Sequence, residues 1–228
     1  MAIGLIILLA VLGLAMLPQM WVKRVLEENS RERTDFPGTG GAFARHLLDE
    51  MKLGDVKVEE TKVGDHYDPQ AKAVRLLPQH MNGRSLAAVV VAAHEVGHAM
   101  QDATGYKPLQ TRTRLATQAR NVERIGSIVL LSAPVVMALV KAPALVLVQI
   151  GAGLLILAST ILMHLTTLPV EFDASFRRAL PVLEAGGYIG PDDMAAARRI
   201  LKAAALTYVA AAAMSLLDVM RWFRVLRP

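Results

Sequence analysis

His94, Glu95 and His98 are the residues of this chain best suited to chemistry, because they form the pattern HEVGH. The alanine-rich run from Ser85 to His94 contains no glycine or proline, which predicts a helix with Ser85 at its N-cap. In a helix, residues four apart lie on one face, so both imidazoles can converge on one ion while Glu95 lies beside them. Two imidazole ligands and a carboxylate base for water are what a hydrolytic zinc site requires.

The alternative interpretation of this stretch is an apolar core helix in which hydrogen bonds satisfy both histidines. Apolar residues surround the motif on both sides, so the helix is expected to be buried. Burying two imidazoles and a carboxylate together without a metal costs much free energy. The metal site is therefore the favoured prediction.

Glu171, in the segment LPVEFDAS, is the candidate for a third metal ligand. A catalytic zinc ion usually has three protein ligands, and the chain has no cysteine to supply a thiolate. The downstream metzincin ligand is absent, since Gln101 and Thr104 stand where glycine and histidine would be needed. Glu171 follows His98 by 73 residues. Its alternative role is a carboxylate at the start of a helix, favoured by the helix dipole.

Three further residues have open roles. His164 lies inside an apolar run and is a rival ligand, but Pro169 is predicted to begin a new helix between it and Glu171, so a hydrogen-bonding role is favoured. Asp173 is either an acceptor behind a ligand imidazole or a solvated charge. Tyr208 either donates to a developing oxyanion or packs in the core. The remaining histidines are predicted to be surface residues: His46, His66 and His80.

Long apolar runs dominate the rest of the chain, which is 54% hydrophobic. Residues 3–21, 125–140 and 144–168 are each long enough to suggest a membrane span, and residues 203–217 form a shorter candidate. The net charge of +5 comes from basic residues that flank these runs, which favours membrane orientation and makes nucleic acid an unlikely partner. We therefore predict a mainly α membrane protein with three to four transmembrane helices.

The domain prediction follows from these runs. Residues 1–22 form an N-terminal transmembrane anchor, and residues 23–124 form a cytoplasmic catalytic part with the HExxH helix. Residues 125–168 form a transmembrane hairpin, which returns the chain to the same face. Residues 169–228 then hold the third ligand and a long C-terminal helix. Four arginines before the hairpin are interpreted as a juxtamembrane collar: Arg112, Arg114, Arg120 and Arg124.

A small β-hairpin is predicted just before the metal helix. Val56, Val58 and Val63 alternate with polar residues, and residues 73–77 read as a second strand after the turn at Asp68. In zinc peptidases an edge strand beside the metal helix commonly holds the substrate backbone by strand addition. Residues 73–77 are the candidate for that strand, and a purely structural hairpin is the alternative.

The motifs HEVGHAMQ, SLAAVVVAA, DHYDP and LPVEFDAS together resemble the YugP-type neutral zinc metallopeptidases of bacterial membranes, over nearly the whole chain. The resemblance implies a membrane-bound, gluzincin-like zinc peptidase with His94, His98 and Glu171 as ligands of one zinc ion and Glu95 as the base. The layout is also similar to that of HtpX-like and CAAX-prenyl endopeptidases, in which the ligand glutamate begins an ExxxD pattern. Ser175 stands at the aspartate position here, so Asp173 is the candidate to replace the missing carboxylate.

The predicted function is zinc-dependent hydrolysis of peptide bonds, with Glu95 as general base. The expected location is the bacterial inner membrane, as a multi-pass protein with its active site on the cytoplasmic side, and the expected partners are the lipid bilayer and a peptide or membrane-protein substrate. One alternative is a site-2-type intramembrane protease, but the apolar run before His94 is short and Asp218 lacks the following glycine of its partner motif. Another is a non-catalytic adaptor with a structural metal. The oligomeric state stays open.

Overall fold

Helix α4 (Leu86–Ala103) runs through the centre of the folded part of the chain, and nearly all of its side chains are buried. The computed structural model describes residues 16–140 and 143–207. The hydroxyl of Ser85 accepts a hydrogen bond from the backbone N–H of Ala88 at 3.2 Å, so the predicted N-cap is confirmed. The helix ends before Gly105, whose φ of +64° suits glycine.

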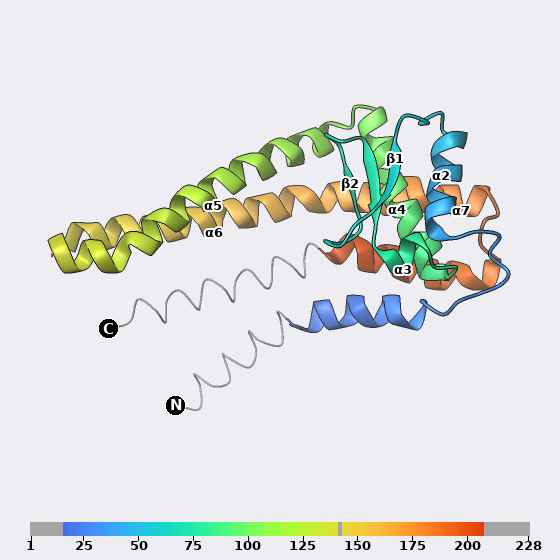
Figure 1. The fold of residues 1–228 in the computed structure, drawn as a ribbon, viewed down its shortest axis with the longest axis horizontal. Helices are drawn as coiled ribbons and strands as arrows, with labels where there is room; N and C mark the ends of the chain where they lie inside the picture. The colour runs from blue at the N-terminus through green and yellow to red at the C-terminus, as the bar shows by residue number, and fades with distance from the viewer. Residues whose placement is uncertain (1–15, 141–142, 208–228) are drawn as a thin grey trace.

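Helix α2 (Gly40–Glu50) packs against α4 and begins at the N-cap Thr39. Its buried face carries Ala44, Leu47 and Leu48, which join the side chains of α4 in one hydrophobic core. A four-residue helix, α3 (Pro78–Met81), leads from the sheet toward α4. Residues 16–28 are also helical, and they lie along one side of this part of the molecule (Figure 1).

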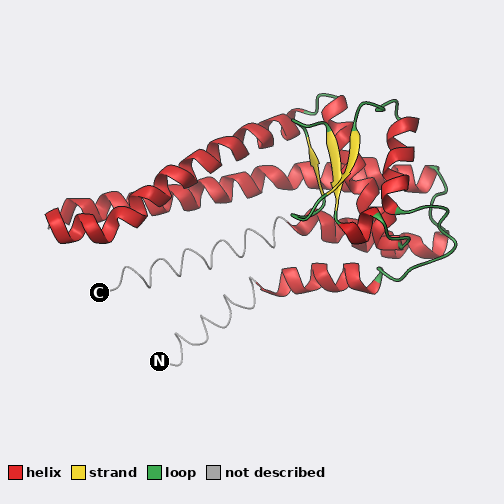
Figure 2. Cartoon of the chain, viewed as in Figure 1, coloured by secondary structure: helices red, strands yellow, loops and turns green. Residues whose placement is uncertain are grey.

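The sheet has three short strands, β1 (Lys57–Glu60), β2 (His66–Asp68) and β3 (Ala73–Leu76), in the order β1-β3-β2 (Figure 2). Strands β1 and β3 pair in parallel, while β2 and β3 pair antiparallel. The predicted hairpin of the valine run with residues 73–77 is therefore wrong. The chain reverses twice between these segments because β2 lies between them in sequence, and the exposed Val63 belongs to the connecting turn.

Two long helices, α5 (Lys107–Val140) and α6 (Pro143–Phe172), lie side by side and extend away from the sheet (Figure 1). Helix α6 continues through Pro169, so the prediction of a new helix beginning at this proline is wrong. A proline inside a helix costs about 3 kcal/mol. Packing of α6 against α5 and the core offsets this cost, and the next two residues, Val170 and Glu171, are fully buried.

The helical path continues after α6 as a π-helix, η1 (Asp173–Ala179), and then as α7 (Leu180–Ala185). The chain turns at Gly186 and Gly187, and a short 3-10 helix, η2 (Pro191–Asp193), precedes the helical residues 194–207. A π-helix is uncommon and often occurs at functional sites. Here it contacts α4 directly, so η1 joins the end of α6 to the helix of the HExxH motif.

Among residues 16–140 and 143–207, no helix combines the length and the apolar composition needed to cross a membrane. The predicted membrane protein with three to four transmembrane helices is thus corrected. In α5 the reason is charge, because its first half carries Arg112 and Arg120. Most of the predicted anchor 1–22 and of the candidate span 203–217 lies outside the described residues.

Candidate metal centre

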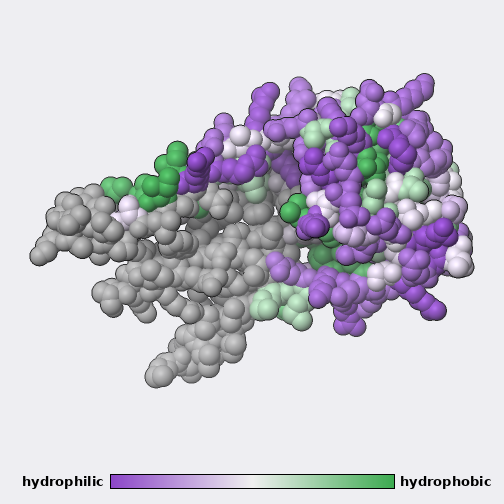
Figure 3. Space-filling view, viewed as in Figure 1, coloured by the Kyte–Doolittle hydropathy of each residue, from purple (hydrophilic) through white to green (hydrophobic). Residues whose placement is uncertain are grey.

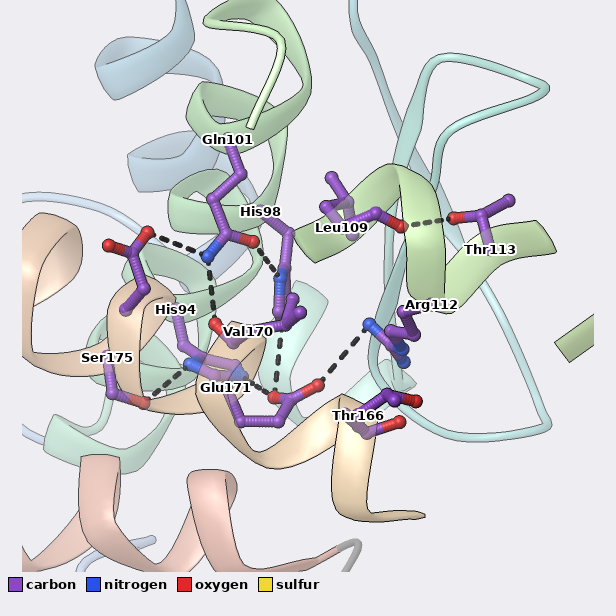
Figure 4. Close-up of polar contacts among 12 residues, drawn as sticks. His94, His98, Gln101, Leu109, Arg112, Thr113, Thr166, Val170, Glu171 and Ser175 are labelled. Carbon is purple, nitrogen blue, oxygen red and sulfur yellow. Dashed lines mark hydrogen bonds and ion pairs between the residues drawn. The ribbon is translucent and has the colours of Figure 1, made fainter. Parts of the chain in front are cut away.

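The side chains of His94, His98 and Glu171 meet in one buried place (Figure 4). The two histidines lie one turn apart on α4, and Glu171 comes from the last turn of α6. Each imidazole Nε2 lies 3.2 Å from the same carboxylate oxygen, Glu171 Oε2. All three residues are at most 5% exposed. The structure therefore brings together the three residues that the sequence singled out.

The outer nitrogen of His94 is held by Ser175 of η1. His94 Nδ1 lies 3.0 Å from Ser175 Oγ, which in turn lies 3.2 Å from the carbonyl oxygen of Leu201. A carbonyl can only accept, so the single hydroxyl proton of Ser175 goes to Leu201 and Oγ accepts from His94 Nδ1–H. This network assigns the proton of neutral His94 to Nδ1, and the lone pair of Nε2 faces Glu171.

Gln101 holds the outer nitrogen of His98 in the same way. His98 Nδ1 lies 2.9 Å from Gln101 Oε1. The amide nitrogen of Gln101 donates to the carbonyl of Val170 and to Asp173 Oδ2, both at 2.8 Å, so Oε1 is left to accept from His98. The lone pair of His98 Nε2 therefore also faces Glu171.

Three acceptor atoms that face each other at this distance need a positive charge between them. Two ligand atoms of a tetrahedral zinc site, each about 2.1 Å from the ion, lie about 3.4 Å apart. The separations of 3.2 Å between Glu171 Oε2 and the two imidazole nitrogens are close to this value. Two imidazoles and a glutamate are also a usual ligand set for catalytic zinc. The residues present thus fit a zinc ion.

The family model described as "Putative neutral zinc metallopeptidase" matches residues 4–227. The chain belongs to this family of neutral zinc metallopeptidases. A relative described as "Putative membrane protease YugP", from Bacillus subtilis (strain 168), is 35% identical over 219 residues, which cover 95% of this chain and 93% of the relative. No solved structure matches the chain. The resemblance seen in the sequence is confirmed: the chain is a zinc metallopeptidase, with zinc as its cofactor.

Glu95 of the metallopeptidase lies next to His94 on α4 and is almost completely buried. Burial raises the pKa of Glu95 to about 8; the charges of Asp65 and Glu171 act in the same direction, whereas those of His94 and Arg112 oppose it. A carboxyl group of this kind can accept a proton and hold it near neutral pH.

Glu171 keeps its charge in spite of complete burial. Burial alone would raise its pKa, but the electrostatic interaction with His98 and the hydrogen bonds with both imidazoles outweigh burial and hold the pKa of Glu171 below its usual range.

Asp173 does not contact an imidazole. It accepts hydrogen bonds from Gln101 and from Arg178 Nε, the latter at 2.8 Å. Asp173 is therefore linked to His98 only through Gln101. Burial opposes its charge, but these two hydrogen bonds outweigh it and hold the pKa of Asp173 below its usual value. Ser175 is the residue that reaches an imidazole directly, at the position of the aspartate in the ExxxD pattern.

Two residues of the metallopeptidase were placed wrongly by the sequence. His80 is buried rather than on the surface, because its Nδ1 lies 2.8 Å from Asp65 Oδ2. Arg112 is not part of an outward-facing collar, since its Nη1 lies 3.3 Å from Glu171 Oε1. No spacing in the sequence indicates this ion pair, because it joins two residues that are 59 positions apart (171 − 112) and lie on different helices.

The structure places the remaining candidate residues in different surroundings. His46 is exposed and His66 is half-buried. The side chain of His164 and the whole of Tyr208 lie outside the described residues. Residues 73–77 cannot bind a substrate by strand addition, because β3 is the central strand and both of its edges are paired. Strand β2 lies at an edge of the sheet and contacts α4.

Proposed function

We propose that this metallopeptidase is an endopeptidase in which His94, His98 and Glu171 hold the zinc ion and Glu95 is the general base. The single observation that supports this proposal best is that Nε2 of both imidazoles lies 3.2 Å from the same carboxylate oxygen of Glu171, on a helix that also carries the buried Glu95.

Each residue has a separate task in this mechanism. When bound, zinc polarises the scissile carbonyl and makes water more acidic. Ser175 and Gln101 orient His94 and His98, so neither imidazole ring has to rotate before its Nε2 can bind zinc. Glu95 accepts a proton from the attacking water and delivers it to the leaving amine. Its burial favours the neutral form, which keeps the proton on Glu95 until the amine takes it.

The substitution Glu95→Gln tests the base. The variant is expected to bind zinc and fold like the parent, while kcat falls about 10²- to 10⁴-fold, the usual contribution of a general base. Peptide cleavage with and without a chelator, together with metal analysis of the purified protein, measures both properties. Glu27→Gln, at an exposed glutamate, is the matched control. Cleavage by Glu95→Gln at the parent rate would show that Glu95 is not the base.

We propose that the substrate is an extended peptide that pairs with the edge strand β2 (His66–Asp68). Strand addition reads the peptide backbone, and β2 contacts the helix that carries Glu95. Replacing Tyr67 in the middle of β2 by proline removes one backbone donor, and it also removes the buried ring and its hydrogen bond to Asp102. Tyr67→Ala removes the same ring and keeps the backbone donor, so KM is expected to be higher for Tyr67→Pro than for Tyr67→Ala. Equal KM values for Tyr67→Pro and Tyr67→Ala would exclude this edge.

We also propose that the enzyme works at a membrane surface, as the name of its relative suggests. Helix α5 carries the exposed Ile125 and Ile128, where Figure 3 shows hydrophobic surface, and α6 carries the exposed Leu147 and Leu154. Binding of the full chain to phospholipid vesicles, measured by flotation, is expected to weaken in Ile125→Ser/Ile128→Ser. The side of the membrane on which the site lies stays a prediction.

A further inference from the structure

The two carboxylate oxygens of Glu171 face different partners. Oε2 lies 3.2 Å from Nε2 of both His94 and His98, while Oε1 lies 3.3 Å from Arg112 Nη1. The pair with Arg112 is an ion pair rather than an aligned hydrogen bond, because within the described part of the chain Oε1 accepts no hydrogen bond. The carboxylate thus has one oxygen directed at the imidazoles and one directed at a guanidinium.

Helix α5 directs Arg112 toward this carboxylate. Leu109, one turn earlier, is only 3% exposed and anchors the first turns of α5 in the core. Residues three apart lie on the same helix face, so Arg112 points in the same direction as Leu109 and reaches Glu171 (Figure 4). Arg114 is exposed instead, although it comes only two residues later.

We infer that Arg112 is a positioning residue that retains Oε1 of Glu171, so that only Oε2 is available to the metal. The inference rests on the proposed function, because it requires zinc at His94, His98 and Glu171. A carboxylate can bind a cation through one oxygen or through both. Catalytic zinc sites keep one coordination position open for water or substrate, and a second carboxylate oxygen would compete for that position.

The positive charge of Arg112 distinguishes its role from that of residues such as Ser175 and Gln101, which accept hydrogen bonds from the ligand imidazoles. Arg112 and zinc are both positive and share the same carboxylate, so Arg112 weakens zinc binding rather than strengthening it. If Arg112 only balanced the buried charge of Glu171, its loss would lower the stability of the metal-free protein and leave the coordination of the bound metal unchanged. A positioning role predicts a change in that coordination.

Cobalt(II) substituted for zinc in the full chain separates these two roles, because its visible absorption is stronger in four-coordinate than in five-coordinate sites. We expect wild type and the control Arg114→Met to have the same strong absorption. Arg112→Met is expected to absorb more weakly, to bind zinc at least as tightly as wild type, and to lose kcat roughly 10- to 100-fold. KM should change little, because the substrate contacts stay.

Arg112→Gln decides the question if Arg112→Met does not fold, since glutamine keeps part of the packing but not the charge. Cobalt spectra and kcat values equal to those of wild type in the folded variants would overturn the role of Arg112. Failure of the proposed function gives a different result. In that case wild type itself would bind no cobalt, or Glu171→Gln and His98→Ala would bind it as wild type does.

Discussion

Ser175 and Gln101 determine which nitrogen of each imidazole faces Glu171. Ser175 donates a hydrogen bond to the backbone carbonyl of Leu201, and Gln101 donates one to that of Val170. Each side chain therefore has an oxygen left that can accept a hydrogen bond from a ring N–H. This arrangement does not need a carboxylate behind His94. A serine at the position of the ExxxD aspartate is therefore compatible with metal binding, because its hydroxyl oxygen accepts the same proton.

Replacement of Ser175 by alanine removes this acceptor. We expect Ser175→Ala to lower zinc affinity about 10- to 100-fold, as is usual when the partner of a ligand imidazole is lost. Ser175→Asp should recover most of the affinity, since a carboxylate accepts from His94 Nδ1–H, but it leaves the carbonyl of Leu201 without its donor and costs about 1 kcal/mol or more of stability.

Competition with a chelator of known affinity measures zinc binding, and urea unfolding measures stability. Ser30→Ala, at an exposed serine, is the control and should match wild type in both. Zinc affinity of Ser175→Ala within twofold of wild type would contradict the assigned proton direction.

At the level of secondary structure, the contact between α4 and η1 decides the position of Glu171, the proposed third ligand. Gly97 lies between His94 and His98 in sequence and faces η1, where a Cβ atom would come within 2.7 Å of the carbonyl oxygen of Ala174. The backbones of the two elements can approach so closely only because this residue has no side chain. Glu171 and Ser175 lie on either side of Ala174, so this approach sets the width of the metal centre.

Gly97→Ala is expected to separate the two elements. Alanine favours a helix over glycine by about 1 kcal/mol, so a gain in stability would result if the site had room. We expect instead a loss of roughly 1–3 kcal/mol, because the added methyl group overpacks the contact, together with weaker zinc binding. Gly153→Ala in α6 is the matched control, since a Cβ atom added there would meet no atom of the described residues within 4 Å. Stabilisation of both variants, measured by urea unfolding, would contradict this packing argument.

The turn between β2 and β3 depends on the charge of Asp68. Its Oδ1 accepts hydrogen bonds from the backbone N–H groups of Gln70 and Ala71, and its Oδ2 lies 2.7 Å from Arg75 Nη1. The hydrogen bond from Ala71 lowers the pKa of Asp68 most; burial opposes this effect, and the bond from Gln70 and the charge of Arg75 add to it. The folded state therefore favours ionised Asp68 more than the unfolded state does.

A pKa lowered in the folded state stabilises the protein above the ordinary pKa of the group, and this stabilisation is lost as the pH falls through the lower, folded value. Asp68→Asn should therefore be less stable than wild type at pH 7, by about 1 kcal/mol, and the difference should shrink below about pH 4. Urea unfolding in chelator across this range measures it, with Asp55→Asn, at an exposed residue, as control. A difference that stays constant down to pH 3 would exclude the role of the charge.

For the whole molecule, the metal centre exists only when distant segments are folded together. The histidines lie on α4, the carboxylate on α6, and the residue that retains its second oxygen on α5. An unfolded chain does not hold these groups at one point, so zinc binds the native state far better than the unfolded state. Zinc binding and folding are therefore linked.

Zinc should raise the free energy of unfolding by about 2.7 kcal/mol at a free concentration of 100 times its Kd. Thermal unfolding with buffered zinc and with chelator measures this effect as a shift in Tm. His98→Ala should abolish the shift, whereas His46→Ala, at an exposed histidine, should keep it. A shift of the same size in both variants would mean that zinc stabilises the protein at another place.

Local features of this chain were predictable from sequence. The cap at Ser85 and the common face of His94 and His98 depend on residues within about one helical turn. Membrane spans were predicted from the apolar content of segments, which does not weigh where arginines and other polar residues interrupt the helix. That prediction failed for the described helices.

Only the tertiary structure decided what joins segments far apart in the chain. The parallel pairing of β1 with β3, the passage of α6 through Pro169, and the contacts of Arg112, Gln101 and Ser175 with the ligand residues all depend on packing between elements. A residue's own neighbours in sequence carry no information about such contacts. The HExxH motif alone thus indicated a zinc site, while the fold determined which groups orient and surround it.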